Sequence, residues 1–149
     1  MQGSKRRIVS VELSFLAHAT EDQDKVLQAV RNILPQEQID NITFIKSKMK
    51  GEYGNPITLF KAQIRDHAAA EALVRNLSSN LLLTDREVLQ HEFEHHVERG
   101  NLYLRFDKQA ALLGETRLCR ADPIRIRIRF NTSRLEELKE KCREIGILP

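Results

Sequence analysis

A short segment near the C-terminus combines three cationic side chains with the alternation of a β-strand. Residues 123–130 read Pro-Ile-Arg-Ile-Arg-Ile-Arg-Phe. Since successive side chains of a strand point to opposite faces, Arg125, Arg127 and Arg129 share one face and the apolar residues share the other. Arginine is always charged, and its planar guanidinium matches the geometry of phosphate. Because phosphate contacts dominate the affinity of proteins for nucleic acids, this row predicts a nucleic-acid-binding surface.

The same three arginines have a second explanation. Charged side chains on an exposed face or edge keep a sheet soluble and prevent it from pairing with other chains. A face with only that role would normally mix acidic and basic residues, and residues 123–130 contain no acidic residue. Both explanations remain open from this strand alone.

A second basic row lies in the first half of the chain. Lys46, Lys48 and Lys50 alternate with uncharged residues, so they also share one face of a predicted strand. A solvated edge strand would explain these lysines equally well. Two rows of the same sign in one small sheet favour a nucleic acid as the ligand. Local patterns do not determine whether the two rows lie on the same surface.

Two tyrosines could add base stacking to these phosphate contacts. Tyr53 lies in the predicted turn at residues 51–56, and Tyr103 lies on the polar face of a predicted strand. Aromatic rings stack on unpaired bases in many RNA-binding proteins. The alternative for Tyr53 is packing within the turn.

One pattern suggests an enzyme. His91, Glu92 and His95 match the HExxH motif, in which two histidines on one helix face bind zinc and the glutamate acts as a base. Glu115 could supply a third, carboxylate ligand. The apolar residues of the same predicted helix, however, place both histidines on the opposite, solvated side. We therefore favour a polar helix face, and we expect no metal site, no cofactor and no catalytic residue.

Length and composition are those of a globular domain. The chain has 149 residues, of which 41% are hydrophobic and 30% charged, and its net charge is +3. We expect one domain over residues 1–149. The chain shows no nucleotide-binding glycine motif and no nucleophile motif, which argues against an enzyme. No signal peptide or apolar run of membrane length is evident, and the two cysteines form no disulfide framework, so we expect a cytoplasmic protein with reduced thiols.

The hydrophobic pattern predicts an α+β fold with the order β-α-β-β-α-α-β-β-β-α. About six mainly antiparallel strands would carry helices on one face. Thr20 and Gln23 predict a capping box for the first helix, and Thr84 predicts another for a helix that runs to Gly100. A last helix is expected to start near Ser133. The strands are predicted at residues 9–15, 42–50, 58–64, 102–107, 113–119 and 124–130.

Three sequence blocks resemble a family of archaeal proteins described as RNA-binding and predicted to associate with the exosome. The blocks are His18-Ala19-Thr20-Glu21-Asp22, Gly54-Asn55-Pro56-Ile57, and Leu102-Tyr103-Leu104-Arg105-Phe106-Asp107-Lys108-Gln109 followed by Gly114. The resemblance extends from about residue 11 to residue 130. It implies a fold like that of the ribosomal protein that binds 5S RNA, and a role in RNA processing, RNA degradation or ribosome biogenesis. The site residues that it suggests are Arg105, Asp107, Lys108, Gln109, His18 and Asn55.

The sequence therefore leads to three hypotheses. The first is a non-enzymatic RNA-binding protein, with exosome or ribosomal components as partners, that contacts phosphate through its basic strand faces. The second is a protein-interaction adaptor that docks or forms a homodimer through exposed sheet edges. The third, and least favoured, is a zinc-dependent hydrolase built on His91, Glu92 and His95. The RNA-binding residues predicted by the first hypothesis are Arg125, Arg127, Arg129, Lys46, Lys48, Lys50, Arg105, Lys108, Tyr53, Tyr103, Asn55 and His18.

Overall fold

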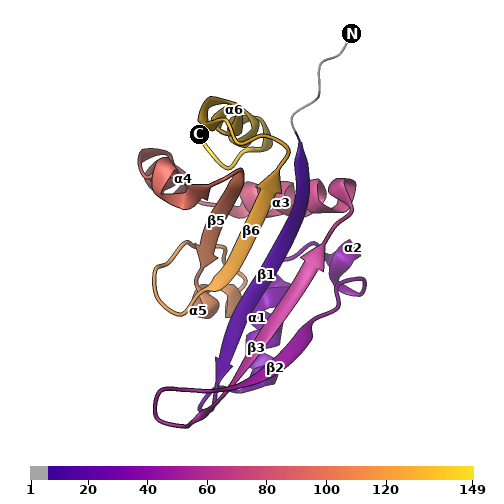
Figure 1. Ribbon diagram of the computed structural model, residues 1–149, viewed down its shortest axis with the longest axis vertical. Helices are drawn as coiled ribbons and strands as arrows, with labels where there is room; N and C mark the ends of the chain where they lie inside the picture. Colours follow the sequence, from indigo (N-terminus) through magenta and orange to yellow (C-terminus); the bar gives the residue numbers. More distant parts are fainter. Residues whose placement is uncertain (1–6) are drawn as a thin grey trace.

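A computed structural model of the protein describes residues 7–149 and contains one six-stranded sheet (Figure 1). The strands, in spatial order, are β2 (Ile45–Lys50), β3 (Pro56–Ile64), β1 (Ile8–His18), β6 (Ile124–Phe130), β5 (Asn101–Phe106) and β4 (Val97–Glu98). Every neighbouring pair is antiparallel. The predicted α+β fold with a mainly antiparallel sheet is confirmed.

Six α-helices occur in the described part of the chain, and they leave one face of the sheet open. They are α1 (Gln23–Asn32), α2 (Gln36–Ile39), α3 (His67–Asn80), α4 (Leu83–His91), α5 (Lys108–Leu112) and α6 (Leu135–Ile145). A 3₁₀ helix, η1 (Phe93–His96), follows α4. Figure 1 looks onto the open face, with α1, α3 and α5 behind the strands. No helix within residues 7–149 is both long enough and apolar enough to cross a membrane.

The core lies between the sheet and the helices. Strand alternation supplies one half of it, because Leu13 of β1 and Ile126 and Ile128 of β6 are at most 1% exposed. Helix periodicity supplies the other half through side chains such as Leu73 of α3 and Leu138 of α6, which are fully buried. The polar residues of the same strands therefore face away from the helices and form the open face.

The first helix begins later than the sequence predicts. Thr20 is not its cap; Asp22 is, and its side chain accepts a hydrogen bond from the backbone N–H of Asp24 at 2.9 Å. β1 continues to His18, and the carboxylate of Glu21 accepts from the backbone N–H of His18 at 3.0 Å. Thr20 therefore lies in the tight turn that follows β1, and the side chain of Gln23 donates to the hydroxyl of Thr58 at 3.0 Å instead of completing a capping box.

Two further predictions about elements are wrong. The helix expected to start at Thr84 and run to Gly100 starts at Leu83 without a side-chain cap and ends at His91. Residues 113–119 form only isolated bridges rather than a strand, and the sixth strand of the sheet is the two-residue β4. In both cases contacts with the rest of the fold override a local capping or alternation pattern. The last helix begins at Leu135, within two residues of the predicted start near Ser133.

Candidate nucleic-acid interface

The arginine row (Arg125, Arg127 and Arg129) lies on the open face. The isoleucines between these arginines are buried against the helices, which leaves the guanidinium groups on the other side of β6. β6 pairs with β1 on one side and with β5 on the other, so the row lies near the middle of the sheet rather than at an edge. A central strand of this kind needs no charge to prevent unwanted pairing.

The register of the sheet gathers more cations around the first of these arginines. Arg125 pairs with Ser14 of β1 and with Arg105 of β5, and Ser14 pairs in turn with Lys61 of β3. Lys61, Ser14, Arg125 and Arg105 thus form a cross-strand row over four adjacent strands spaced about 4.8 Å apart. Sequence inspection identified Arg105 and Arg125 but missed Lys61. The alternation of Leu59, Lys61 and Gln63 could have indicated it, but only with the strand register known.

Arg105 and Arg125 stand directly opposite each other. Like charges in this position destabilise a sheet, by up to about 1 kcal/mol. Within residues 7–149, neither arginine forms an ion pair with an acidic side chain. Both side chains are exposed. The pair is therefore an unneutralised concentration of positive charge that is ready to accept an anion.

Only the middle of the arginine row is neutralised by an acid among the described residues. Arg127 lies beside Glu12 of β1, with a guanidinium nitrogen 3.5 Å from the carboxylate. Glu12 also accepts a hydrogen bond from the side chain of Gln63 at 3.0 Å. The residues that pair with Arg125 and Arg129 on β1 are serines, Ser14 and Ser10. The open face is thus predominantly basic, not the even mixture of signs that a purely protective surface would carry.

The lysine row (Lys46, Lys48 and Lys50) lies on the opposite side of the sheet. Lys46 pairs with Phe60, a fully buried residue of β3, and its ammonium lies over the Phe60 ring at 5.6 Å from the centroid. The residues that β2 directs toward the open face are instead Ile45, Ser47 and Met49. The two basic rows therefore do not share a surface, and one flat stretch of RNA cannot contact both of them through the open face.

The two tyrosines lie in different parts of the structure. Tyr103 pairs with Arg127 and is half-buried on the open face, where it lines a hollow of about 460 Å³ together with Arg105, Arg125 and Lys61. Tyr53 is 93% exposed at the tip of the β2–β3 hairpin, so it does not pack within the turn. Only Tyr103 is placed to stack on a base bound along the arginine row.

Lys108 is buried, contrary to what a phosphate contact requires. It is 6% exposed, and its ammonium donates to the carbonyl of Leu16 at 2.6 Å, to Glu21 at 3.2 Å and to Asp122 at 3.0 Å. These partners use the three donors of the ammonium group. Lys108 therefore joins the end of β1, the start of α1 and the loop before β6, and has no free donor for RNA.

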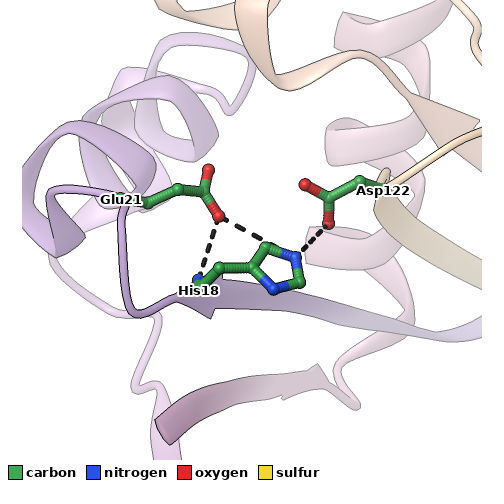
Figure 2. Close-up of side chains that lie close together, drawn as sticks. All are labelled: His18, Glu21 and Asp122. Atoms are coloured by element: carbon green, nitrogen blue, oxygen red, sulfur yellow. Dashed lines mark hydrogen bonds and ion pairs between the residues drawn. The ribbon is translucent and has the colours of Figure 1, made fainter. Parts of the chain in front are cut away.

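His18 belongs to the same cluster. Its Nε2 lies 3.0 Å from Asp122 Oδ1, and Figure 2 shows the imidazole between the carboxylates of Glu21 and Asp122. Burial raises the pKa of Asp122, but hydrogen bonds from His18 and Lys108 outweigh it and hold that pKa below its usual value. Asp122 itself has a left-handed backbone with φ of 46°. The cluster thus fixes a strained loop immediately before the arginine strand.

The same cluster has the composition of a metal site, but its charge is already balanced. The ligand atoms of His18, Glu21 and Asp122 lie within 4.8 Å of one another. The Lys108 ammonium hydrogen-bonds to both carboxylates and so supplies the positive charge that a cation would bring. We therefore assign the cluster a structural role, as the anchor of this end of the sheet.

The residues of the HExxH motif do not have the geometry of a zinc site. α4 ends at His91, Glu92 leaves the helical conformation with ψ of 13°, and His95 lies in the 3₁₀ helix η1. The two histidines therefore do not share the face of one α-helix, which the motif requires. The Nδ1–H of His96 donates to the carbonyl oxygen of Tyr103, 3.1 Å away. Neither His91, His95 nor Glu115 belongs to a group of potential metal ligands in residues 7–149.

Asn55 lies in the turn of the β2–β3 hairpin, away from the arginine row. Its carbonyl accepts from the N–H of Gly51 at 2.7 Å, and Gly54 adopts a positive φ of 79°. Ile57, which follows in the same sequence block, pairs with His18 of β1. The turn therefore determines the shape of the hairpin. The three sequence blocks that resemble the archaeal family meet at this end of the sheet.

The chain matches a family of known proteins. A family model described as RNA binding matches residues 10–130, which is most of the chain. The protein belongs to this RNA-binding family. The matched segment contains β2 to β6 in full and all of β1 except its first two residues.

Relatives of known sequence or structure come from archaea. The chain is 31% identical over 140 residues to RNA-binding protein PAB1135 of Pyrococcus abyssi, covering 91% of each chain. It is 34% identical over 142 residues to uncharacterized protein MJ0213 of Methanocaldococcus jannaschii, covering 91% of this chain and 93% of the relative. The crystal structure of protein AF2318 from Archaeglobus fulgidus is 32% identical, with a TM-score of 0.78 over 93% of this chain and 99% of that one.

Proposed function

We propose that this protein is a non-enzymatic RNA-binding protein that holds the phosphate backbone on the open face of its sheet. The observation that carries the proposal is the cross-strand row of Lys61, Ser14, Arg125 and Arg105, in which none of the three cations forms an ion pair with an acid among residues 7–149. A ligand with closely spaced phosphates offers the neutralisation that the protein itself does not supply. Membership of the RNA-binding family and the name of the Pyrococcus abyssi relative support RNA as that ligand.

The interface differs in part from the set of residues expected from the sequence. It comprises the arginine row, Arg105, Tyr103 and Lys61. Lys108 and His18 support it from the anchor cluster, and the lysine row serves the edge strand β2, because lysine on an edge discourages pairing with another chain. Tyr53 and Asn55 remain candidates for a separate contact at the hairpin tip.

Binding across a salt series tests the proposal. We expect a labelled RNA to bind with an affinity that falls steeply with salt, by a slope of roughly 0.7 for each phosphate contact to a single strand. Replacing Arg125, Arg127 and Arg129 together by glutamine should lower the affinity at least tenfold and reduce the slope by roughly 2. The same change at Lys46, Lys48 and Lys50 is the matched control, since it removes equal charge from the other side of the sheet. Equal losses in both triple variants would contradict the proposal.

We propose, more specifically, an accessory role in RNA processing or degradation, alongside exosome or ribosomal components. Support for this finer role comes from the family resemblance of the three sequence blocks. The sheet with helices on one face is also compatible with the ribosomal-protein-like fold that the resemblance implies. Affinity purification of the tagged protein from an archaeal lysate, with and without ribonuclease treatment, tests it. If the fraction purified without ribonuclease contains no exosome or ribosomal protein, the result would argue against this role.

A second candidate function is that of a protein-interaction adaptor. β2 is an edge strand whose six residues are all exposed, and Ile45 and Met49 on its open side are 69% and 46% exposed. Such an edge could extend the sheet into a second chain, including another copy of this protein. Sedimentation of the protein at increasing concentration distinguishes the two functions. A stable dimer with no salt-dependent affinity for RNA would favour the adaptor.

A further inference from the structure

The open face changes character along the strands, from cationic to apolar. Leu16 of β1 pairs with Leu59 of β3. This pair lies two residues along β1 from Ser14 of the cross-strand row, a distance of about 7 Å toward the end of the strand. Both leucines lie on the same side of the sheet as Ser14 and are only half-buried. Pro123, which precedes β6, lies beside them. An apolar floor thus adjoins the positive row without a break.

Two hollows of the surface join at this boundary. The first, of about 460 Å³, contains Arg105, Arg125 and Lys61. The second, of about 390 Å³, contains Leu16, Pro123 and His18. Ser14, Leu59 and Arg125 line both of them, so they form one trough. Pockets that bind small ligands have volumes in this range.

The apolar end of the trough also carries polar groups. His18 and Asp122 line it, and they are held to each other at 3.0 Å and, through Asp122, to the buried Lys108. Groups fixed in this way can form hydrogen bonds with a ligand without losing much conformational freedom on binding. The trough therefore offers, in sequence along the sheet, cations, an apolar surface and a rigid polar end.

We infer that the trough binds one unpaired nucleotide of the RNA. Its phosphate lies against Lys61, Arg125 and Arg105, its base lies flat on Leu16 and Leu59, and the edge of the base faces His18 and Asp122. A base inside a duplex is stacked on both sides and cannot enter such a hollow, whereas an unpaired base can. This inference rests on the proposed function and makes it more specific, since it assigns the protein to single-stranded, bulged or looped RNA.

The first test uses mononucleotides as probes. Adenosine, cytidine, guanosine and uridine monophosphates are each titrated into the protein while the methyl signals of Leu16 and Leu59 and the ring signals of His18 are followed by NMR. Ribose 5-phosphate and inorganic phosphate serve as controls that lack the base. We expect at least one nucleotide to shift the leucine and histidine signals where the controls do not. Identical shifts from the nucleotides and from ribose 5-phosphate would overturn the inference.

The second test separates the base contact from the phosphate contacts. Leu59→Ala removes half of the apolar floor and no charge, and Leu113→Ala is its matched control because Leu113 is 78% exposed outside the trough. We expect Leu59→Ala to weaken binding of a single-stranded oligonucleotide about fivefold or more, with the salt slope and the affinity for a perfect RNA duplex unchanged. Leu16→Ala provides an independent second variant, and thermal melting verifies that each variant is folded.

The outcomes are distinguishable. If the wild-type protein binds RNA with a steep salt slope but Leu59→Ala and Leu16→Ala affect single strands and duplexes alike, the nucleotide trough is refuted and the proposed function stands. If the wild-type protein shows no salt-dependent binding of either RNA, both are refuted. A selective loss for single strands supports both.

Discussion

The arginine row and the lysine row show that the same local pattern can have different surroundings. Each has three cations at alternate positions of a strand. β6 lies inside the sheet and its arginines occupy the open face, where the adjacent strand β5 adds Arg105 and β3, on the far side of β1, adds Lys61. β2 lies at the edge, and its lysines occupy the other side, with Lys46 over the ring of Phe60.

Alternation therefore specifies which residues share a face but not what that face meets. On the open face, Arg105 and Lys61 add positive charge to the arginine row, and among the described residues Glu12 is the acid that forms an ion pair with the row. Such an excess of positive charge is favourable when a polyanion binds. The neighbours of β2 leave a row of cations along an open edge, where lysine prevents pairing with another strand. These surroundings support the proposal that the first row binds nucleic acid and that the second protects the edge.

Charge reversal should separate the two rows most strongly. Arg125→Glu with Arg129→Glu changes the net charge by the same amount as Lys46→Glu with Lys50→Glu. We expect RNA affinity at low salt to fall on the order of 100-fold in the first variant, because both phosphate contacts become repulsive, and only a few-fold in the second. Fluorescence anisotropy with a labelled RNA measures both. A fall of similar size in the lysine variant would remove the distinction between the rows.

Moving one lysine across the sheet should increase binding. Exchanging Ser47 and Lys48, as Ser47→Lys with Lys48→Ser, keeps the composition unchanged but turns one ammonium toward the open face. We expect the RNA affinity to rise severalfold and the salt slope to increase by up to roughly 0.7. An affinity below that of the wild-type protein would indicate that the lysine row itself contacts RNA.

Removing Glu12, the acid beside the arginine row, should also increase RNA affinity, but by a smaller factor. Glu12→Gln releases Arg127 from its carboxylate partner, 3.5 Å away, and retains the shape of the side chain. We expect about a twofold to threefold gain in RNA affinity at low salt, because an exposed ion pair contributes less than about 1 kcal/mol. The gain should disappear above roughly 0.5 M salt, where screening is strong. Unchanged affinity at low salt would indicate that Arg127 does not reach the RNA.

The smallest expected effect concerns the stability that Asp122 contributes at the start of the arginine strand. The pKa of Asp122 is held below its usual value, so its stabilising contribution is complete above the ordinary pKa of an aspartate, about 4. The contribution is lost as pH falls through the lower pKa of the folded state. Since the side chain is 45% exposed, screening limits the effect to below about 1 kcal/mol, or a few degrees in melting temperature.

Asp122→Asn is the variant that tests this contribution. Between about pH 5 and pH 2 its melting temperature should depend on pH less steeply than that of the wild-type protein. Glu136→Gln, at an exposed carboxylate of α6, is the control and should leave the dependence unchanged. Parallel melting curves for the wild-type protein and Asp122→Asn would show that Asp122 does not stabilise the fold.

Much of the architecture was accessible from the sequence because it depends on periodicity. The alternation at residues 124–130 and the amphipathic pattern of the last helix each predicted the correct element. The errors occurred where two local signals competed. Thr20 and Thr84 are good capping residues, but β1 extends to His18 and α4 begins one residue before Thr84, because packing outweighs the modest preference of one cap.

The site was only partly accessible for a related reason. Arg125 and Tyr103 could be proposed from their residue types and alternation, and Arg105 from the family resemblance. Lys108 is a cation of the same sequence block as Arg105 and Tyr103. It is nevertheless buried in an ion cluster with partners up to 92 positions away. No local pattern reports such a contact, because it depends on where distant elements meet.

The amino-acid sequence alone predicts the two cationic rows, the single face that each occupies on its strand, and the α+β fold. These properties follow from side-chain periodicity, which a strand or helix imposes over a few residues. Only the folded structure places the rows on opposite sides of the sheet, brings Lys61 and Arg105 beside one of them, and continues that row into a trough with Leu16 and Leu59. Strand order and register bring residues far apart in the chain into one surface, and they are set by the packing of the whole core.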